Sequence, residues 1–151
     1  MHLTVLNGPN LNLLGEREPE VYGRTSLTDI EAACRALCTE HGATLTFAQT
    51  NGEGELIGLV QDARRGDGLV LNPGGYTHTS VALRDAVAAC SCPVIELHLS
   101  NPAAREPFRH VSLIAGVVTG TIAGLGADGY SLALTALLRR SGAASGNQSE
   151  E

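Results

Sequence analysis

Hydrophobic positions along this chain follow two different periods, and the two alternate. Short apolar runs rich in β-branched residues, typical of buried strands, occur at 3–6, 44–49, 68–71, 93–99 and 117–122. Apolar residues that recur every three or four positions, typical of amphipathic helices, occupy 26–42, 54–65, 80–90 and 128–140. Because strands alternate with helices at this spacing, the pattern predicts a parallel sheet with helices on both faces.

Five predicted strands in 151 residues fit an α/β fold of the flavodoxin-like kind. This is a three-layer fold on a five-stranded parallel sheet with strand order 2-1-3-4-5. In that order the chain reverses direction between strands 1 and 3, so a ligand crevice should open beside the loops that follow them. We expect a single catalytic domain over 1–140. Residues 141–151 are small, polar and finally acidic without an apolar period, which predicts a disordered polar tail.

Charge and composition exclude several classes of function. A formal net charge of −6 and a pI of about 5.3 argue against a nucleic-acid or anionic-membrane partner, because both need a basic face. All ten basic residues are arginine, so no side-chain amine is available for an imine, a pyridoxal phosphate anchor or a phosphate-loop lysine. Any anionic ligand must therefore be bound by locally placed arginines.

The four cysteines favour packing over a metal site. Cys34 with Cys38, and Cys90 with Cys92, have CxxxC and CxC spacings instead of the paired CxxC of a structural zinc site. We therefore expect buried thiols and no metal. The N-terminal apolar stretch ends by Asn7, which is too short for a signal sequence or a membrane span, and we expect a cytoplasmic protein.

Acid–base candidates stand on the fourth predicted strand. Side chains two residues apart on a strand point to the same face, so Glu96 can orient the imidazole of His98. The alternative is a structural hydrogen-bonded pair, but a place at the expected crevice favours a catalytic dyad. Backbone amides of the following Ser100-Asn101-Pro102 loop could hold a carboxylate. Arg105 and Arg109 come next, within one helical turn, and the sequence does not decide which of them contacts a ligand.

Two loops can supply the rest of a pocket. The glycines of Asn72-Pro73-Gly74-Gly75-Tyr76-Thr77-His78 allow close backbone approach, so Asn72 and His78 frame a pocket unless this is an ordinary turn before a helix. The loop over 15–24 has flanking glycines, typical of a lid. A tyrosine has a pKa near 10, so Tyr22 acts as a base only if a cation, Arg17 or Arg24, stabilises its phenolate; a packing anchor is the alternative.

One motif resembles a dinucleotide-binding loop. Gly124-Leu125-Gly126-Ala127-Asp128-Gly129 matches GxGxxG after a strand and before a helix. However, it opens the last predicted helix, no strand follows, and the acidic partner expected about 20 residues on has no structural place. We interpret these glycines as turn and close-packing residues.

Five motifs in fixed order carry a more specific resemblance. They are Leu6-Asn7-Gly8-Pro9-Asn10-Leu11-Asn12, the lid from Arg17 to Tyr22, Gln49-Thr50-Asn51, Asn72-Pro73-Gly74-Gly75 and Glu96-Leu97-His98-Leu99-Ser100-Asn101. Together they resemble type II 3-dehydroquinate dehydratase over roughly residues 3 to 138. The resemblance implies a hydro-lyase of the shikimate or quinate pathway, which converts 3-dehydroquinate to 3-dehydroshikimate by anti elimination of water. The reaction passes through an enolate and uses no cofactor.

The resemblance also implies roles for individual residues. Tyr22, as a phenolate, would take a proton from C2, and Arg17 would lower its pKa and complete the closed lid. His98, oriented by Glu96, would protonate the departing C1 hydroxyl. Asn10, through an ordered water, would stabilise the enolate oxygen.

Substrate-binding positions are implied in the same way. Asn72 with the backbone of Leu99 and Ser100 would hold the substrate carboxylate. His78 and Arg109 would hold the ring hydroxyls, and Arg105 is left as scaffold.

Asp85 matches a position that reaches the site of a neighbouring subunit, consistent with the family's trimer-built dodecamer, so a homo-oligomer is implied. The chain departs from the usual family pattern at Pro102-Ala103, where a β-branched residue and histidine are common, and at Leu113, where tyrosine is common. These departures concern how the Arg109 segment is supported and how subunits pack, since neither is a chemical position.

Two alternatives remain open from the residues alone. One is a flavodoxin-like ligand-binding domain without catalysis, which gives no reason for Glu96 and His98. The other is a different lyase or hydrolase on the same fold, because the residues by themselves lead only to an acid–base site for a carboxylated polyol.

Overall fold

The computed structural model describes residues 1–146, with every side chain except those of Tyr22 and residues 141–146. The strands are β1 (His2–Asn7), β2 (Thr44–Gln49), β3 (Gly68–Asn72), β4 (Val94–His98) and β5 (Gly120–Ala123). The helices are α1 (Pro19–Tyr22), α2 (Leu27–Glu40), α3 (Glu53–Ala63), α4 (Val81–Ala88) and α5 (Asp128–Gly146). Strands and helices alternate as the apolar periods predicted.

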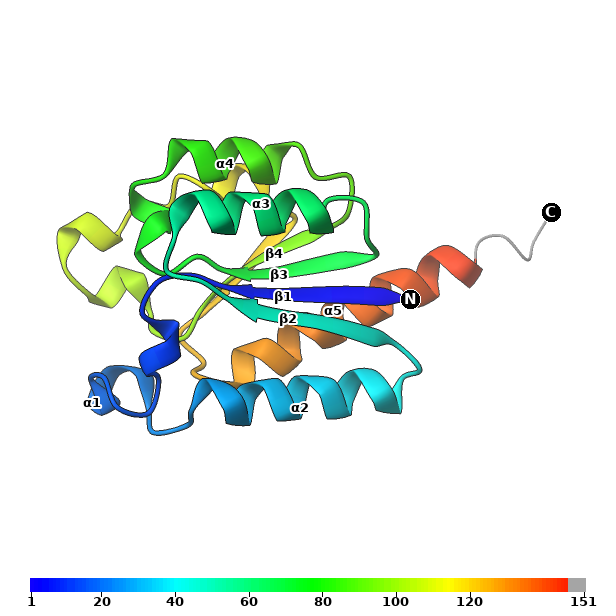
Figure 1. The fold of residues 1–151 in the computed structure, drawn as a ribbon, viewed down its shortest axis with the longest axis horizontal. Helices are drawn as coiled ribbons and strands as arrows, with labels where there is room; N and C mark the ends of the chain where they lie inside the picture. Colours follow the sequence, from blue (N-terminus) through cyan, green and yellow to red (C-terminus); the bar gives the residue numbers. More distant parts are fainter. Residues whose placement is uncertain (147–151) are drawn as a thin grey trace.

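The strands form one parallel sheet in the order β2-β1-β3-β4-β5, which confirms the predicted α/β fold and its strand order. The end of β1 lies between two neighbours, because Asn7 pairs with Gln49 on one side and with Asn72 on the other. Since all strands run the same way, their carboxyl ends meet at one edge of the sheet. The short helix α1 and the loops after β1 and β4 gather at this edge, at the left of Figure 1.

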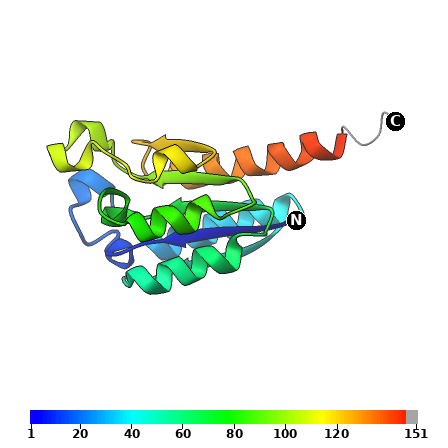
Figure 2. The same ribbon diagram turned by 90° about the horizontal axis from the view of Figure 1, so that it is seen from above.

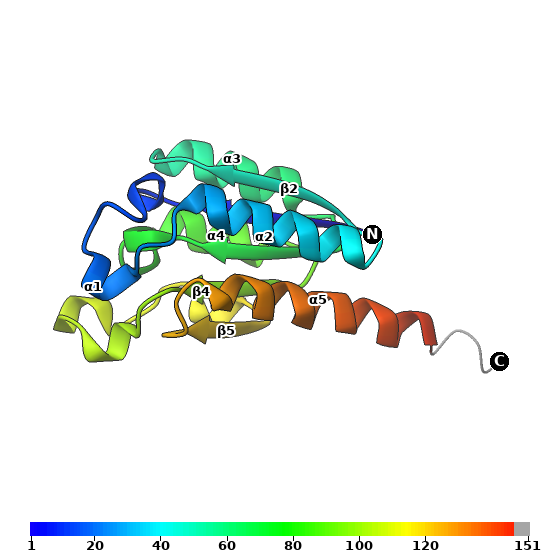
Figure 3. The same cartoon turned by 90° about the horizontal axis from the view of Figure 1, so that it is seen from below.

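Helices cover both faces of the sheet in the three layers that the pattern predicted. Helices α3 and α4 lie on one face and α2 and α5 on the other (Figure 1). The view from above has α3 and α4 in front (Figure 2), and the view from below has α2 and α5 in front (Figure 3). Because both faces are covered, the central strands are buried on both sides, as their continuous apolar runs require.

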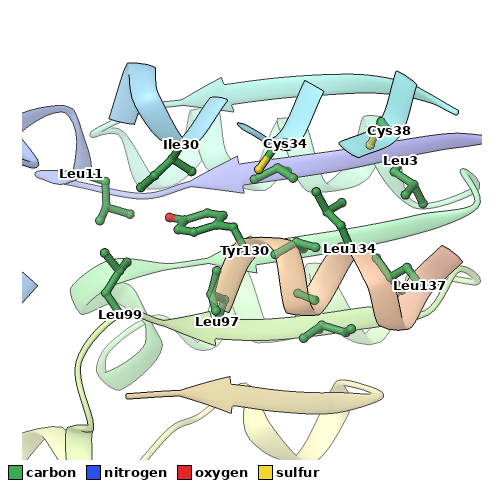
Figure 4. Close-up of a cluster of buried hydrophobic side chains, with 14 of the residues drawn as sticks. Leu3, Leu11, Ile30, Cys34, Cys38, Leu97, Leu99, Tyr130, Leu134 and Leu137 are labelled. Carbon is green, nitrogen blue, oxygen red and sulfur yellow. The ribbon is translucent and has the colours of Figure 1, made fainter. Parts of the chain in front are cut away.

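The two faces of the sheet pack into two hydrophobic clusters. On β3, Val70 joins the cluster under α2 and α5, whereas Leu69 and Leu71 join the cluster under α3 and α4. Figure 4 shows the first cluster, in which Cys34 and Cys38 of α2 face Leu134 and Leu137 of α5 across the sheet surface. Burial raises the pKa of the Cys34 thiol to about 12. All four cysteines are free thiols; Cys34, Cys38 and Cys92 are buried as expected, whereas Cys90 is only half-buried.

Local signals fix where α2 begins and ends. The Ser26 hydroxyl accepts a hydrogen bond from the Asp29 backbone N–H, and the Asp29 carboxylate accepts one from the Ser26 N–H, each at 3.1 Å. The two bonds form a capping box, which fixes the first turn of the helix. These bonds, the backbone one first, lower the pKa of Asp29. After α2 the chain turns at Gly42, whose φ of 68° lies in the left-handed region that favours glycine.

Two predicted boundaries were wrong. Residues 117–119 do not belong to β5, because the apolar Val117 and Val118 pack against the α3 and α4 cluster instead of pairing with β4. Helix α5 continues past Arg140 to Gly146, six residues into the segment predicted as a tail. This stretch has two alanines, which favour a helix, and two glycines, which do not, and no proline interrupts it, so the backbone hydrogen-bond pattern of α5 can continue without an apolar face. Residues 147–151, the remainder of that segment, lie outside the described residues.

Over residues 1–146, no helix is both long enough and apolar enough to cross a bilayer.

Candidate active site

A cavity of about 160 Å³ opens at the carboxyl edge of the sheet, beside the loops that follow β1, β3 and β4. This is where the strand order placed the crevice. Eight of the site residues proposed from sequence line it: Asn10, Arg17, Asn72, His78, His98, Leu99, Ser100 and Arg109. Arg105 lines it too, so three arginines surround a small cavity in a chain of net charge −6.

Glu96 and His98 form a hydrogen-bonded pair at the end of β4, as their spacing predicted. The carboxylate can only accept, so His98 Nε2 donates to Glu96 Oε2, at 2.6 Å. Glu96 is fully buried behind His98, and His98 reaches the cavity. Because Nε2 is occupied, Nδ1 is the ring atom of His98 that remains for a ligand.

Two hydroxyl groups complete the surroundings of the Glu96 carboxylate. Thr77 Oγ1 donates to Oε2 at 2.6 Å, and Ser112 Oγ lies 2.9 Å from both carboxylate oxygens. Burial is the largest influence on the pKa of Glu96 and raises it, but the hydrogen bonds from His98, Thr77 and Ser112 together outweigh burial and lower this pKa. A buried carboxylate that stays ionised beside an imidazole is suited to stabilise the protonated ring.

A second imidazole lies next to His98. The rings of His78 and His98 are stacked, with centroids 6.4 Å apart and planes at 17°. His78 Nδ1 donates to the Val111 carbonyl at 2.7 Å, since a carbonyl oxygen can only accept. The Nε2 atom of His78 is therefore the one available to accept from or donate to a ligand in the cavity.

The segment that carries Arg105 and Arg109 is not a helical turn, and that prediction was wrong. Prolines at 102 and 107 each begin a separate 3-10 turn, Pro102–Ala104 and Pro107–Arg109, and Arg105 between them is extended. Both arginine side chains nevertheless reach the cavity. Arg109 Nε pairs with Glu106 Oε2 at 2.5 Å.

Arg105 joins the lid to the loop after β4. Its Nη1 donates to the Ser100 hydroxyl at 3.3 Å, and its Nη2 lies 3.7 Å from Glu18 Oε2. The Arg105 side chain is only 15% exposed. The resemblance had left this residue as scaffold, and the structure places it at the cavity wall.

The lid includes a short helix that the sequence pattern did not predict. Gly15 and Gly23, with φ of 91° and 78°, flank the segment that contains α1. Such values favour glycine, the residue expected at both ends of a lid. Tyr22 is the last residue of α1, and its side chain lies outside the described atoms. Arg17, just before α1, lines the cavity.

Asn10 and Asp85 occupy different surroundings. Asn10 lines the cavity in a left-handed conformation, φ 69°, which asparagine tolerates, and its N–H donates to Asn51 Oδ1 at 3.0 Å. Asp85 stands on α4 outside this cavity, with a side chain 67% exposed beside Arg84. Within 1–146, no group of three or more His, Cys, Asp or Glu side chains is placed to hold a metal ion.

The glycine motif after β5 holds the loop after β4 by backbone contacts. Gly124 N–H donates to the His98 carbonyl at 3.2 Å, and Gly126 N–H to the Leu99 carbonyl at 3.0 Å. Both glycines have positive φ, 84° and 62°. This agrees with the turn and close-packing role expected for them.

A family model described as dehydroquinase class II matches residues 1–138. The chain belongs to this family. Among named relatives, a 3-dehydroquinate dehydratase from Hyphomonas neptunium is 60% identical over 141 residues, 93% of this chain and 95% of the relative. A 3-dehydroquinate dehydratase from Bacillus licheniformis is 56% identical over 135 residues, 89% of this chain and 93% of the relative.

Solved dehydroquinases share this fold as well. A type II dehydroquinase from Propionibacterium acnes superimposes with a TM-score of 0.88 at 43% identity, over 91% of this chain and 96% of that structure. A 3-dehydroquinate dehydratase-like protein from Bifidobacterium longum gives 0.69 at 31% identity, over 92% and 96%. The flavodoxin-like arrangement inferred from the strand pattern is therefore that of a dehydroquinase.

Three residues of this dehydroquinase site were missed at the level of sequence. Thr77 and Ser112 hold Glu96, and Tyr130 donates a hydrogen bond to Asn7 and accepts one from Asn72. Thr77 lies within a motif already singled out, directly before the proposed ligand contact His78, and this place was a usable signal. Tyr130 follows the pattern of a core aromatic residue, and nothing local indicates its polar partners.

Proposed function

We propose that this crevice carries out the dehydroquinase reaction with Tyr22 as the base and His98 as the acid. The chain is a hydro-lyase of the 3-dehydroquinate dehydratase type, and the reaction it catalyses gives 3-dehydroshikimate and water. The observation that carries the proposed roles is the buried, ionised Glu96 bonded to His98 at the cavity wall. A ligand-binding domain without catalysis is not favoured, because it gives no role to this pair.

The first step removes the proton from C2. Tyr22 as phenolate takes this proton, and the electron pair of the C–H bond forms the enolate of C2, C3 and the C3 oxygen. Arg17 stabilises the phenolate as a neighbouring cation, which its place at the cavity wall just before α1 supports. Asn10, through an ordered water, stabilises the negative charge on the enolate oxygen.

The second step expels the C1 hydroxyl. The enolate electrons form the C1–C2 double bond as the C1–O bond breaks, and His98 Nδ1 gives its proton to the departing oxygen to form water. Glu96 stabilises the imidazolium before this transfer. The elimination neither oxidises nor reduces the substrate, so it needs no redox cofactor. We expect no metal either, because Asn10 with its water stabilises the enolate and His98 protonates the leaving hydroxyl.

Substrate binding uses the remaining wall of the cavity. Asn72 and the backbone N–H groups of Leu99 and Ser100 hold the carboxylate, and His78 Nε2 and Arg109 hold ring hydroxyls. Three cavity arginines offset the negative charge of the chain around this anionic ligand.

The enzyme acts as a homo-oligomer, a dodecamer built from trimers, in the cytoplasm. Asp85 reaches the cavity of a neighbouring subunit, which its exposure outside its own cavity supports. Sedimentation should give the mass of twelve 15.7 kDa chains. A monomer that turns over substrate at full rate would contradict the role of Asp85.

Adding 3-dehydroquinate to the purified protein should produce the ultraviolet absorbance of a conjugated enone carboxylate. No signal at generous enzyme concentration would contradict the assignment. The variants Tyr22→Phe and His98→Ala should each lose at least roughly a hundredfold in kcat and still bind ligand, because general acid–base catalysis contributes at least this much. Unimpaired turnover in either variant would remove that residue from its proposed role.

A further inference from the structure

A buried row of side chains connects the end of β1 to the substrate cavity through α5. Asn7 Nδ2 donates to the Ala48 carbonyl at 3.1 Å, and Tyr130 Oη donates to Asn7 Oδ1 at 2.6 Å. Asn72 Nδ2 donates to Tyr130 Oη at 3.0 Å, and the Gly74 N–H donates to Asn72 Oδ1 at 3.2 Å. We call these four bonds the Tyr130 relay. Figure 4 shows the Tyr130 ring in the core with its hydroxyl directed toward the carboxyl ends of the strands.

The direction of every bond in the Tyr130 relay is fixed by its two ends. The Ala48 carbonyl can only accept, so Asn7 must present its amide nitrogen there and its oxygen to Tyr130. Tyr130 then donates its single hydroxyl proton to Asn7, so it can only accept a hydrogen bond from Asn72. At the other end the Gly74 N–H can only donate, so it requires the oxygen of Asn72. Both ends therefore demand the same orientation of the Asn72 amide.

This orientation decides what Asn72 offers to a ligand. An amide nitrogen carries two N–H groups, and in the described part of the chain Asn72 uses one of them, on Tyr130. Asn72 lines the cavity, so its second N–H is a donor for an anionic oxygen. The reversed amide would instead present a carbonyl oxygen, which repels a carboxylate.

We propose that Tyr130 is a positioning residue, whose hydroxyl holds the Asn72 amide so that a donor faces the substrate carboxylate. The proposal rests on the proposed function for the identity of the ligand, but its geometry applies to any carboxylate in the cavity. Tyr130 is 1% exposed and does not touch the ligand site directly. Burial raises the pKa of Tyr130, so the hydroxyl keeps the proton that the Tyr130 relay needs.

The variant Tyr130→Phe keeps the ring in the core and removes only the hydroxyl. Since the carboxylate is bound in ground and transition states alike, we expect KM for 3-dehydroquinate to rise about tenfold while kcat changes less than about threefold. Tyr76→Phe is the matched control, because the Tyr76 hydroxyl donates to the Asn51 carbonyl, outside the Tyr130 relay. This control should leave the recognition of the carboxylate unchanged.

Two ligands that differ in a single group distinguish a positioning role of Tyr130 from general damage to the binding site. Calorimetric titration with 1,3,4,5-tetrahydroxycyclohexane-1-carboxylate and with its carboxamide measures how strongly the protein prefers the charged group. Tyr130→Phe should reduce this preference about tenfold, and Tyr76→Phe should not reduce it. Equal weakening of both ligands in Tyr130→Phe, or an unchanged preference, would overturn the proposal. Binding requires no turnover, so a wild-type protein that binds with this preference but does not dehydrate 3-dehydroquinate would contradict only the proposed function.

The wild-type protein gives a second test if Tyr130→Phe fails to fold. In the nitrogen-15 spectrum of the Asn72 side-chain amide, one proton should exchange slowly with solvent, because it is bonded to the buried Tyr130. The other proton should shift when the carboxylate ligand is added and shift less with the carboxamide. Two fast-exchanging protons, or a shift confined to the slow one, would overturn the proposal.

Discussion

Replacing Glu96 by glutamine keeps the shape of the side chain and removes its charge. The carboxylate is fully buried and accepts from His98, Thr77 and Ser112. Both hydroxyl groups can rotate to accept from an amide, so the variant retains hydrogen-bond partners and should fold. What it loses is the negative charge that, in the proposed mechanism, stabilises protonated His98.

The size of this loss follows from the contact. A hydrogen bond to a charged group contributes about 1.5–3 kcal/mol net, and the 2.6 Å distance between His98 Nε2 and Glu96 Oε2 is typical of the charged kind. A neutral hydrogen bond still contributes about 0.5–1.5 kcal/mol, so the variant loses only the difference, about 1–1.5 kcal/mol. At about 1.36 kcal/mol per factor of ten, this lowers kcat roughly 5- to 13-fold. Glu96 does not line the cavity, so KM should change little.

Initial rates of ultraviolet absorbance increase with 3-dehydroquinate give kcat and KM for Glu96→Gln. The control is Glu31→Gln on α2, which removes a carboxylate from an exposed ion pair with Arg35 and should leave both constants unchanged. If Glu96→Gln keeps the wild-type kcat, the pair is structural and the role of Glu96 is wrong.

Three further outcomes are expected. Because the pKa of Glu96 is lowered in the folded protein, the stabilisation from its charge is present above its ordinary pKa of 4.5 and is lost as pH falls through the lowered pKa. The free energy of unfolding should therefore fall less steeply with acid in Glu96→Gln than in the wild type. Equal slopes in the two proteins would contradict this. A Cβ at Gly8 would press on the Pro73 carbonyl, so Gly8→Ala should lose about 1–3 kcal/mol in urea unfolding, whereas Gly58→Ala on α3 meets nothing and should lose none. Chelator treatment should leave turnover intact, and loss restored by a divalent metal would show a metal requirement.

Much of the fold was predictable because its signals are local. The apolar period changes from two to about 3.6 along the chain, and Ser26 with Asp29 marks a helix start within four residues. The crevice was predictable for a related reason, since a parallel sheet brings the carboxyl ends of its strands to one edge. Glu96 and His98 needed only the two-residue period of a strand.

What sequence could not supply depends on contacts between distant segments. Tyr130 is 58 residues from Asn72 and 123 from Asn7, so its polar role appears only after α5 packs on the sheet. Helix α1 has four residues, too few to show a period. The helical turn predicted for Arg105 and Arg109 was wrong because it rested on their spacing alone, whereas two prolines divide the segment into separate turns.

The stereochemistry of the elimination tests the central claim most directly. In the proposed mechanism the base, Tyr22 on the lid, and the acid, His98 on β4, act on opposite faces of the substrate ring, so we expect the proton lost from C2 to lie anti to the departing C1 hydroxyl. 3-Dehydroquinate carrying deuterium at C2 on the anti face should give product without the label, and substrate labelled on the syn face should give product that retains it. Loss of the syn label with retention of the anti label would contradict the account.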